Sequence, residues 1–588
     1  VLPLPGAYGW FAAVHLFLAG MFTYLLGRTL RLSRGGALVA GVVFELCGFL
    51  VIGNVFPMIV AAAVWLPLIL VAIERIARRQ VGTASLLQHV PDVALGAVAF
   101  GMVCLAGHPE MYFYIGLVVA LYALWRLAGV YRTRRRWCEV VVAAEAMAVL
   151  AAIGIGLGCA QWLPLLDVLR DSVRQAGVGL SQVLSWAYPK RHVLALFMPD
   201  VFGNPAHHAV RDLFTLQRQA VTVNALGDPV DNTFWGIKNY VEGAAYVGTL
   251  TLLLAPAALL RRKGDTRWFW AALGILALLF SFGTPLYALV YALPGFGQVR
   301  TPFRWVYVYS LCMALLAGMG VDALSEPVSS APGKLARALD GMGHRGLAWL
   351  AVTVGAAALA LVGAARLNPD RAIALAGRIM AALSGAERGF ADARMFLSYE
   401  ARNVALFGGA LLAGGLLILL RFRLRRGVWP TLAAGLIAAE LLVIGRPFFP
   451  ANSTRLVAYE TPAITWLKQQ QGPFRITALV GPDEKTFNAN AGMLYGLEDV
   501  RGYDSIIPRQ YAEFMSLLQE QTELQYNRIA PIYVANAAAL DSPLLDLLNV
   551  RYVLTSAQQT VSSPGWRLAY EGELRIYENL DVLPRAFL

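Results

Sequence analysis

Charged residues are scarce in this sequence, and cysteines are scarcer still. Asp, Glu, Lys and Arg make up 15% of the 588 residues, whereas 58% are hydrophobic. Apolar side chains therefore far outnumber those that the core of a soluble protein needs, and the excess must face lipid. The five cysteines lie in or beside apolar runs and form no closely spaced pair. Neither a disulfide framework nor a cysteine-based metal site is indicated.

The net charge of +12 does not have the distribution of a nucleic-acid-binding surface. Residues 446–588 hold 12 basic and 15 acidic side chains, so residues 1–445 carry a surplus of +15. This surplus lies in short segments between apolar runs, where it sets the orientation of membrane helices. We therefore expect the lipid bilayer, and no nucleic acid, as a partner.

Twelve apolar runs between residues 7 and 445 are long enough to predict helices that enter or cross a membrane. Because the run at 92–107 is short and could be re-entrant, we expect about eleven crossings. The runs are 7–30, 35–53, 55–76, 92–107, 109–129, 138–164, 241–260, 267–283, 303–323, 346–366, 403–421 and 428–445.

Five arginine-rich clusters fall on one side of the membrane if every run crosses, and the positive-inside rule makes that side cytoplasmic. The predicted fold is mainly α, a polytopic transmembrane helical bundle over residues 1–445. Its outer loops are 165–240, 284–302 and 367–402. The clusters are Arg28–Arg34, Arg75–Arg79, Arg132–Arg136, Arg261–Arg267 and Arg421–Arg426.

Residues 446–588 have the composition of a soluble domain, which this topology places on the outer face. Thr461 followed by Pro462 predicts the start of a helix, and a second helix is expected at Gln510–Gln519. Strands are predicted at Phe474–Val480, Val550–Leu554 and Leu574–Tyr577. A small α/β or α+β domain follows from this pattern. Because residue 1 is Val and the chain stops inside an apolar run, we expect the sequence to be a fragment.

The turn Gly107-His108-Pro109-Glu110 is the first candidate site. A predicted helix ends there on the outer face, and another starts with Pro at its first position. The free N–H groups of such a helix start favour an anion. His108 could add a proton or a metal ligand, and Glu110 a carboxylate. The alternative is a tight turn in which Glu110 only complements the helix dipole.

A second candidate is the predicted outer segment Phe197–His208, which holds Asp200 and the pair His207 and His208. These residue types transfer protons or bind metals, but their spacing matches no specific ligand pattern, so no metal site is assigned. An ordinary surface loop is the alternative.

The third candidate is the pair Arg300 and Arg304, just before a predicted membrane helix. Two guanidinium groups could clamp a lipid-linked phosphate, or they could reach anionic headgroups instead. Tyr240 and Glu242 lie at the mouth of another predicted helix, 241–260, where Glu242 either faces the same cavity or caps its helix.

Charges inside the apolar runs are costly unless they are paired. Glu45 is central in its run, whereas Glu145 and Glu440 lie nearer the ends. We expect Glu45 to face the bundle interior as a structural partner rather than as a transport site. His15 is interpreted as a packing residue.

Several short motifs resemble, in order and spacing, those of the bacterial YfhO membrane-protein family. That family is similar in architecture to the GT-C superfamily of membrane glycosyltransferases. The resemblance extends over nearly the whole chain. Its motifs are Ala106–Glu110, Arg300–Arg304, Leu316–Gly320, Val500–Ser505, Leu548–Tyr552 and Leu583–Ala586.

The resemblance implies a GT-C-like enzyme in the bacterial plasma membrane that moves a sugar from a polyprenyl-phosphate donor to a cell-envelope polymer, such as teichoic acid. Arg300 and Arg304 would bind the donor phosphate. A carboxylate base would deprotonate the acceptor hydroxyl. GT-C enzymes usually hold this base in the first outer loop, so we expect it to be absent from this fragment.

The remaining candidates would then lie around the donor. The resemblance implies catalytic candidates His108, Glu110 and Asp200, and cavity-lining residues Tyr240, Glu242, His207 and His208. A divalent metal is conceivable, although no pattern supports one.

Two other functions fit the sequence. A flippase for lipid-linked saccharides would depend on Glu45, but the inverted repeats typical of transporters are not evident. A non-catalytic envelope assembly factor would depend on the domain from Arg446 onward, although twelve helices exceed what an anchor requires.

Overall fold

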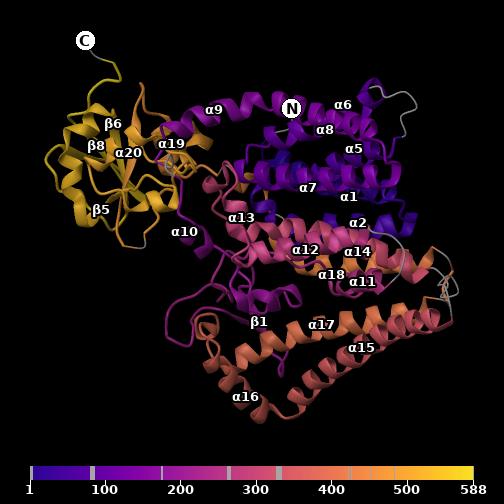
Figure 1. Ribbon diagram of the computed structural model, residues 1–588. Helices are drawn as coiled ribbons and strands as arrows, with labels where there is room; N and C mark the ends of the chain where they lie inside the picture. The colour runs from indigo at the N-terminus through magenta and orange to yellow at the C-terminus, as the bar shows by residue number, and fades with distance from the viewer. Residues whose placement is uncertain are drawn as a thin grey trace. The chain divides into compact units, whose positions relative to one another are not determined.

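A computed structural model describes residues 4–79, 86–173, 177–260, 266–325, 334–421, 423–425, 427–450, 452–457, 459–482 and 484–586. The chain forms two compact units (Figure 1). The membrane unit comprises Ala7–Trp162 and Val178–Pro450, and the C-terminal unit comprises Val1–Gly6, Leu163–Gly177 and Ala451–Leu588. The C-terminal unit thus takes in a segment that the sequence assigned to an outer loop of the bundle.

Within the described ranges, nine helices are long and apolar enough to cross a membrane. All twelve predicted runs contain helix, so the predicted polytopic bundle is confirmed. The nine spans contain α1 (Leu4–Thr29), α4 with α5 (Pro57–Ala63, Leu66–Arg78), α6 (Val90–Leu105), α7 (Pro109–Arg134), α8 (Trp137–Leu157), α14 (Val306–Ser325), α15 (Lys334–Leu367), α17 (Ala393–Leu420) and α18 (Val428–Gly445).

Three further apolar segments are broken or short. Helices α2 (Arg34–Leu46) and α3 (Gly48–Val51) belong to a tenth candidate span that is bent by 41°. Helices α11 (Thr249–Leu260) and α12 (Thr266–Ser281) are shorter than the other spans. The prediction of about eleven crossings therefore corresponds to nine or ten full-length spans and two short helices.

The predicted start of the helix at 241–260 is wrong, because α11 begins only at Thr249. Gly248 has a φ of +91°, which interrupts the backbone before it. The free N-terminus of α11 is then capped from α18. Glu440 accepts the Thr249 N–H at 3.0 Å and its hydroxyl at 2.6 Å. Glu440 is therefore a helix cap supplied by another segment.

The predicted helices at 346–366 and 403–421 begin earlier in the structure, at Lys334 and Ala393. The start of α17 is fixed by Asp392, whose side chain accepts the N–H of Met395 at 2.7 Å. The predicted loop 367–402 consequently contains α16 (Pro369–Ala382) and the first turns of α17. The run predicted at 138–164 ends as α8 at Leu157, and α9 (Cys159–Arg170) follows it.

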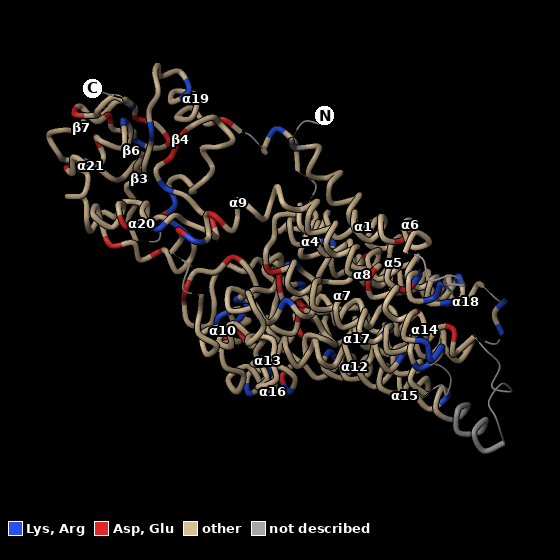
Figure 2. Tube along the Cα trace, turned by 45° about the horizontal axis from the view of Figure 1, so that its top comes forward, with Lys and Arg blue, Asp and Glu red and all other residues tan. Residues whose placement is uncertain are grey.

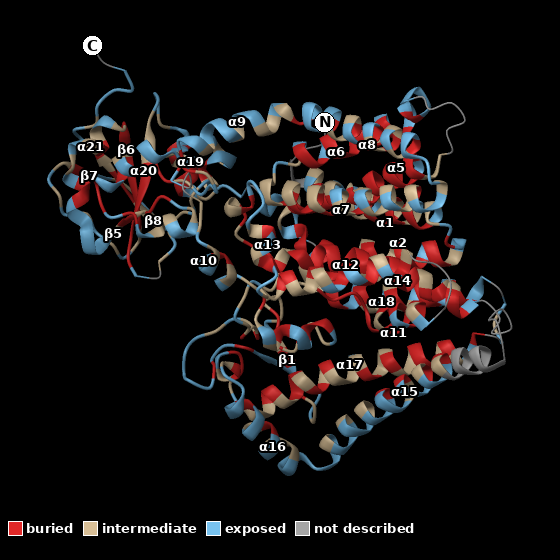
Figure 3. Ribbon diagram, viewed as in Figure 1, coloured by how far each residue is buried: buried red, intermediate tan, exposed pale blue. Residues whose placement is uncertain are grey.

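Helices α5 and α14 form the core of the membrane unit, while α15 faces outward. In the spans that contain α5 and α14, 78% of the best apolar window is buried, against 17% for α15 (Figure 3). Close approach between α2 and α14 needs glycine, because a Cβ on Gly36 would lie 2.6 Å from the Gly318 carbonyl oxygen. The outward apolar surface of α15 matches a lipid-facing helix.

Arginine and lysine gather at one end of the membrane bundle, where α5 and α14 end and α18 begins (Figure 2). At this end Arg134 donates to the Ala77 and Arg78 carbonyl oxygens, both at 3.1 Å, and pairs with Glu139 at 2.7 Å. The described members of the predicted basic clusters thus meet at a common end. Helix α7 runs from the opposite end, at Pro109, to this one.

The C-terminal unit is a small mixed sheet with short helices, as predicted. Its strand order is β4-β3-β6-β8-β7, with β5 paired to β3. Strand β3 is parallel to β4, β5 and β6, whereas β6, β8 and β7 are antiparallel. The strands are β3 (Arg475–Val480), β4 (Glu498–Asp499), β5 (Ile532–Tyr533), β6 (Val550–Ser556), β7 (Trp566–Glu571) and β8 (Leu574–Asn579).

The two predicted helices of this unit are α19 (Pro462–Lys468) and α20 (Arg509–Ser516). The end of α9 and the residues after it, up to Val173, lie beside α20, since the Arg509 N–H donates to the Asp171 carbonyl oxygen at 2.7 Å. The predicted fold class, a membrane bundle followed by a small α/β or α+β domain, is confirmed.

Candidate functional site

The turn between α6 and α7 holds the first sequence candidate in a fixed geometry. Gly107 has a φ of +79°, a conformation that suits glycine, and Pro109 opens α7. His108 is the N-cap residue but makes no side-chain cap, so its ring is free for other contacts. The turn lies at the end of α7 that is opposite its basic end, Arg132–Arg134.

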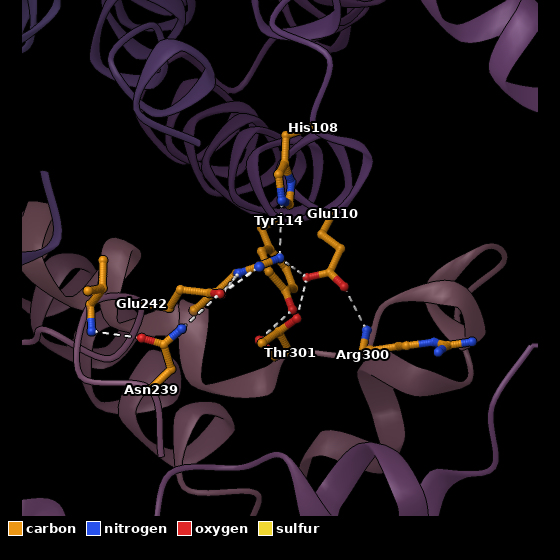
Figure 4. Close-up of polar contacts among 9 residues, drawn as sticks. His108, Glu110, Tyr114, Asn239, Glu242, Arg300 and Thr301 are labelled. Carbon is orange, nitrogen blue, oxygen red and sulfur yellow. Dashed lines mark hydrogen bonds and ion pairs between the residues drawn. The ribbon is translucent and has the colours of Figure 1, made fainter. Parts of the chain in front are cut away.

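Glu110 binds the segment before α14 rather than only its own helix. Its Oε1 accepts the Arg300 N–H at 2.9 Å, and its Oε2 accepts the Thr301 hydroxyl at 2.6 Å (Figure 4). One turn further along α7, the Tyr114 hydroxyl donates to the Thr301 carbonyl oxygen at 2.9 Å. The first two turns of α7 therefore hold the Arg300–Arg304 turn in place.

Arg304 is enclosed by two carboxylates. Its Nη1 lies 2.5 Å from Glu110 Oε2, while its Nε and Nη2 lie 2.6 and 2.5 Å from Glu242 Oε2. The three side chains are only 12–16% exposed. A buried charge of this kind is tolerated only when it is paired, so this triad fixes the geometry of the site. Glu242 does not cap a helix, because it lies in the loop before α11.

His108 completes this cluster as a neutral ring that accepts a hydrogen bond from Arg304. Its Nε2 lies 3.2 Å from Arg304 Nη1, and because a guanidinium can only donate, Nε2 must accept. The proton of the neutral ring is then on Nδ1, a buried atom that has no hydrogen-bond partner in the ranges that the structure describes. Burial and the nearby Arg304 charge lower the pKa of His108 to about 4. At neutral pH the ring therefore offers one unused N–H.

Arg300 differs from Arg304 in having no carboxylate partner in the described part of the chain. Its backbone N–H is held by Glu110, but its guanidinium points away from the cluster (Figure 4). The buried Nε has no hydrogen-bond partner among the described residues, and burial lowers the pKa of Arg300. The two arginines of the predicted phosphate clamp thus differ: Arg304 pairs with two carboxylates, whereas Arg300 forms no ion pair with a described residue, although the charge of Glu110 acts on it.

A second polar cluster is built around Asp200, which is 3% exposed. Its Oδ1 accepts the Tyr240 hydroxyl at 2.6 Å and the Asn204 amide at 2.9 Å. Arg402 lies 3.5 Å from Oδ2, and Asn403 donates to the Asp200 carbonyl oxygen at 3.1 Å. The pKa of the buried Tyr240, which lies next to this carboxylate, is raised well above its ordinary value. Both carboxylate oxygens of Asp200 therefore already have a protein partner.

The two histidines of the second candidate segment contact different residues. His207 Nδ1 lies 2.9 Å from the Tyr399 hydroxyl, beside the Asp200 cluster. His208 is exposed, and its Nδ1 lies 2.7 Å from the Asp231 carbonyl oxygen. In the ranges that the structure describes, no three His, Cys, Asp or Glu side chains are grouped as metal ligands.

Sequence reasoning missed the residues that α17 contributes, because it started that helix at residue 403. Glu400 accepts the Asn403 amide at 3.1 Å with Oε2, while its buried Oε1 has no partner. Asp392 could have indicated the earlier start of α17, because Asp is a strong N-cap residue. Asp200, Asn403 and Glu440 line a cavity of about 320 Å³ between α17 and α18, whose other walls are apolar apart from Tyr246.

Three charged or polar groups inside the apolar runs fall outside these clusters. The Glu45 carboxylate packs against Gly20 of α1, and no described residue pairs with it. Glu145 is exposed. His15 Nδ1 donates a hydrogen bond to the Phe11 carbonyl oxygen at 2.8 Å, and the ring packs on the Phe11 ring. His15 therefore has the packing environment that the sequence suggested.

No family model matches the sequence, and no curated protein sequence matches it. Among solved structures, the chain is similar to ArnT from Cupriavidus metallidurans bound to undecaprenyl phosphate. The identity is 14% over 97% of this chain and 83% of that chain, with a TM-score of 0.43. It is also similar to the apo Archaeoglobus fulgidus oligosaccharyltransferase, at 12% identity, 94% and 59% coverage and a TM-score of 0.39. Likeness at this level carries no argument about activity.

Proposed function

We propose that this protein is a GT-C-type membrane glycosyltransferase, which transfers a sugar from a polyprenyl-phosphate donor to a cell-envelope polymer. The observation that carries the proposal is the contrast between its two site arginines. Arg304 is neutralised by Glu110 and Glu242, whereas the half-buried Arg300 keeps its charge without a partner in the described residues. A fixed, partly desolvated guanidinium of this kind favours a phosphate ligand.

The proposal places the reaction on the outer face of a bacterial plasma membrane. The basic residues gather at the other end of the bundle, and basic loops stay in the cytoplasm. Helix α7 connects the two ends, with His108 before its start and Arg134 at its finish. The site would therefore be open to a lipid-linked donor that has already reached the outer leaflet.

In this mechanism the acceptor oxygen forms a bond to the anomeric carbon while the bond from that carbon to the phosphate oxygen breaks. The acceptor hydroxyl gives its proton to a base, and polyprenyl phosphate leaves. Arg300 stabilises the negative charge that develops on the phosphate, since it is fixed before the reaction. His108 Nδ1–H, which has no partner among the described residues, is a second hydrogen-bond donor for an oxygen of the lipid-linked sugar.

The carboxylates of the two clusters are positioning residues in this scheme. Glu110 and Glu242 are held by Arg304, and Asp200 accepts hydrogen bonds from Tyr240 and Asn204. Each of these carboxylates already has protein partners that hold it in place. The proton of the acceptor is therefore not assigned to any of these three groups.

The full-length protein in liposomes tests this proposal when it is incubated with radiolabelled polyprenyl-phosphate sugars and a cell-envelope acceptor fraction. We expect label transfer, and a loss of at least 100-fold for Arg300→Ala, in line with the roughly 10²–10³-fold effect of removing one fixed donor. Arg378→Ala, an exposed arginine on α16, is the matched control and should be unaffected. Absence of transfer with every donor would reject the proposal.

One observation favours the flippase alternative. The bent span formed by α2 and α3 is broken at Cys47, two residues after Glu45, which has no described partner. Broken helices often mark transport sites. A flippase would move labelled lipid between leaflets without an acceptor, and Glu45→Gln would abolish that movement. A transferase would show transfer that Glu45→Gln leaves intact.

A further inference from the structure

Three motifs that lie far apart in the sequence meet at one edge of the sheet in the C-terminal unit. They are the Val500–Ser505, Leu548–Tyr552 and Leu583–Ala586 segments, which the membrane site does not use. Arg585 Nη2 lies 3.0 Å from Glu498 on β4, and its Nε donates to Asn549 Oδ1 at 3.2 Å. The first motif starts directly after β4.

The same edge carries two further charged contacts. Arg475 on β3 lies 3.5 Å from Glu498 and donates to the Leu548 carbonyl oxygen at 3.0 Å. Arg501 is almost fully buried and donates to both carboxylate oxygens of Asp499, at 3.0 and 2.6 Å. The guanidinium groups are thus held in fixed positions before any ligand arrives.

A cavity of about 660 Å³ lies beside these contacts, and their members Arg475, Glu498, Asp499 and Arg501 line it. Its charged lining consists of Arg475, Glu498, Asp499, Arg501 and Asp504, and apolar side chains such as Met493 and Ile529 line the rest. The volume lies within the range of about 300–1,000 Å³ that is usual for small-molecule pockets. The cavity is therefore large enough for a ligand of several rings.

An exposed aromatic residue, Tyr503, lies in the chain between Gly502 and Asp504, which both line this cavity. Tyr503 is 51% exposed. Its carbonyl oxygen accepts the Asn490 side-chain amide at 2.7 Å, and its N–H donates to Asn490 Oδ1 at 3.1 Å. Asn490 itself lines the cavity. The exposed Tyr503 ring therefore offers an apolar face that needs little ordering when a ligand binds.

The charges around the cavity balance. With Arg585 included, three arginines stand against Glu498, Asp499 and Asp504. A strongly charged ligand would meet repulsion as well as attraction here. A polyhydroxylated neutral ligand fits better, because each hydroxyl can donate to a carboxylate and accept from a guanidinium. The C–H face of a sugar ring would pack on the aromatic side chain.

We propose that the cavity beside β4 binds a neutral saccharide. This makes the C-terminal unit a carbohydrate-binding domain with a site of its own. The site is separate in sequence from the His108, Arg300 and Arg304 cluster. Only its biological role rests on the proposed function, since a transferase would use it to hold the sugar chain of the acceptor.

The test measures binding without any donor, so it does not depend on transfer. The full chain in detergent is titrated with maltotriose, chitotriose and a glycerol phosphate oligomer by isothermal calorimetry. Glu498→Ala and Tyr503→Ala change two exposed side chains, so both variants should fold. Glu571→Ala is the matched control. Glu571 is an exposed carboxylate on β7, at the other edge of the sheet, and it pairs with Arg575.

We expect at least one neutral trisaccharide to bind, and binding to weaken about tenfold or more in Glu498→Ala and Tyr503→Ala but not in Glu571→Ala. The proposal is overturned if neither trisaccharide binds, if these variants leave binding unchanged, or if the glycerol phosphate oligomer binds more tightly. Saccharide binding by a protein that shows no transfer would reject the proposed function and leave this site standing.

Discussion

Tyr240 and Glu242, which are separated by one residue on the loop before α11, connect the two polar clusters of the membrane unit. The Tyr240 hydroxyl donates to Asp200 at 2.6 Å, and the Glu242 carboxylate accepts from Arg304 at 2.6 Å. Asn239, at the start of the same segment, contacts Glu242 at 3.4 Å. A displacement of this short loop would therefore disturb both clusters together.

This connection predicts that the two clusters are energetically coupled. Tyr240→Phe and Glu242→Gln each remove part of the contacts that hold the loop, so their effects on the free energy of unfolding should not add. We expect a coupling of about 0.5–1 kcal/mol in a double-mutant cycle measured by SDS titration. Tyr122→Phe, which removes a hydrogen bond to Glu74 at the basic end of α7, should be additive with Tyr240→Phe. Additivity of all pairs would contradict the coupling.

Removal of Arg304 should destabilise the membrane unit severely. It leaves Glu110 and Glu242 buried without their shared partner, and breaking a buried ion pair costs about 3–5 kcal/mol. We expect Arg304→Ala to lower the thermal midpoint of the detergent-solubilised protein strongly. Arg378→Ala on α16 should leave it unchanged. A midpoint close to the wild type for Arg304→Ala would show that the triad is not a structural element.

The sequence predicted those features of the site that depend on local signals. The turn at Gly107–Glu110 follows from glycine and proline at a helix boundary, and Arg300 and Arg304 stood out as charges beside an apolar run. It did not predict that Glu110 pairs with Arg304, because the two are 194 residues apart and only tertiary packing brings them together. It assigned both arginines to the phosphate, which stays a prediction, and it did not predict that Arg304 pairs with two carboxylates.

The same distinction, between local signals and contacts made by tertiary packing, explains which parts of the fold were predicted. Long apolar runs predicted the spanning helices, whereas helix starts that depend on distant partners were misplaced, as for α11 with its cap from Glu440. In the C-terminal unit the buried strands β3, β6 and β8 were predicted. Strand β7 was missed because most of its side chains are exposed or half-buried, which leaves little apolar alternation to detect.

Gly107→Ala should reduce both stability and transfer. An alanine at a φ of +79° is strained by roughly 1–2 kcal/mol, and relief of that strain would move His108, the next residue. Gly116→Ala, within α7, is the control because a Cβ there meets no atom within 4 Å. We expect a lower thermal midpoint and slower transfer only for Gly107→Ala. Equal behaviour of the two variants would mean that the turn does not position the site.

The lowered pKa of His108 predicts how pH acts on the protein. The folded state holds this proton less tightly than the unfolded chain, whose pKa is near the ordinary value of 6.5, since burial and Arg304 bring the folded value to about 4. The unfolded state binds more protons below pH 6.5, so stability should fall as the pH drops from about 6.5 to 4. His108→Ala should weaken this acid sensitivity of the thermal midpoint.

Transfer should show no inflection near pH 6.5 that depends on His108, because its ring stays neutral across that range. His108→Ala should lower the rate of label transfer by a similar factor at about pH 6 and pH 8. The control is Glu145→Ala, which changes an exposed residue on α8 and should leave rate and profile unchanged. An inflection near pH 6.5 that disappears in His108→Ala would show a proton-transfer role instead of a neutral donor.

The cysteines allow a test of the proposed orientation in the membrane. Cys138 is the exposed one among the five free cysteines, and it follows the basic cluster between α7 and α8. A membrane-impermeant maleimide should label it in inside-out vesicles but not in intact spheroplasts, because basic loops stay in the cytoplasm. Ser453→Cys in a Cys138→Ala background, an exposed position after α18, should show the reverse pattern. Labelling of Cys138 from the outside would place the His108 and Arg300 site in the cytoplasm, where a donor in the outer leaflet could not reach it.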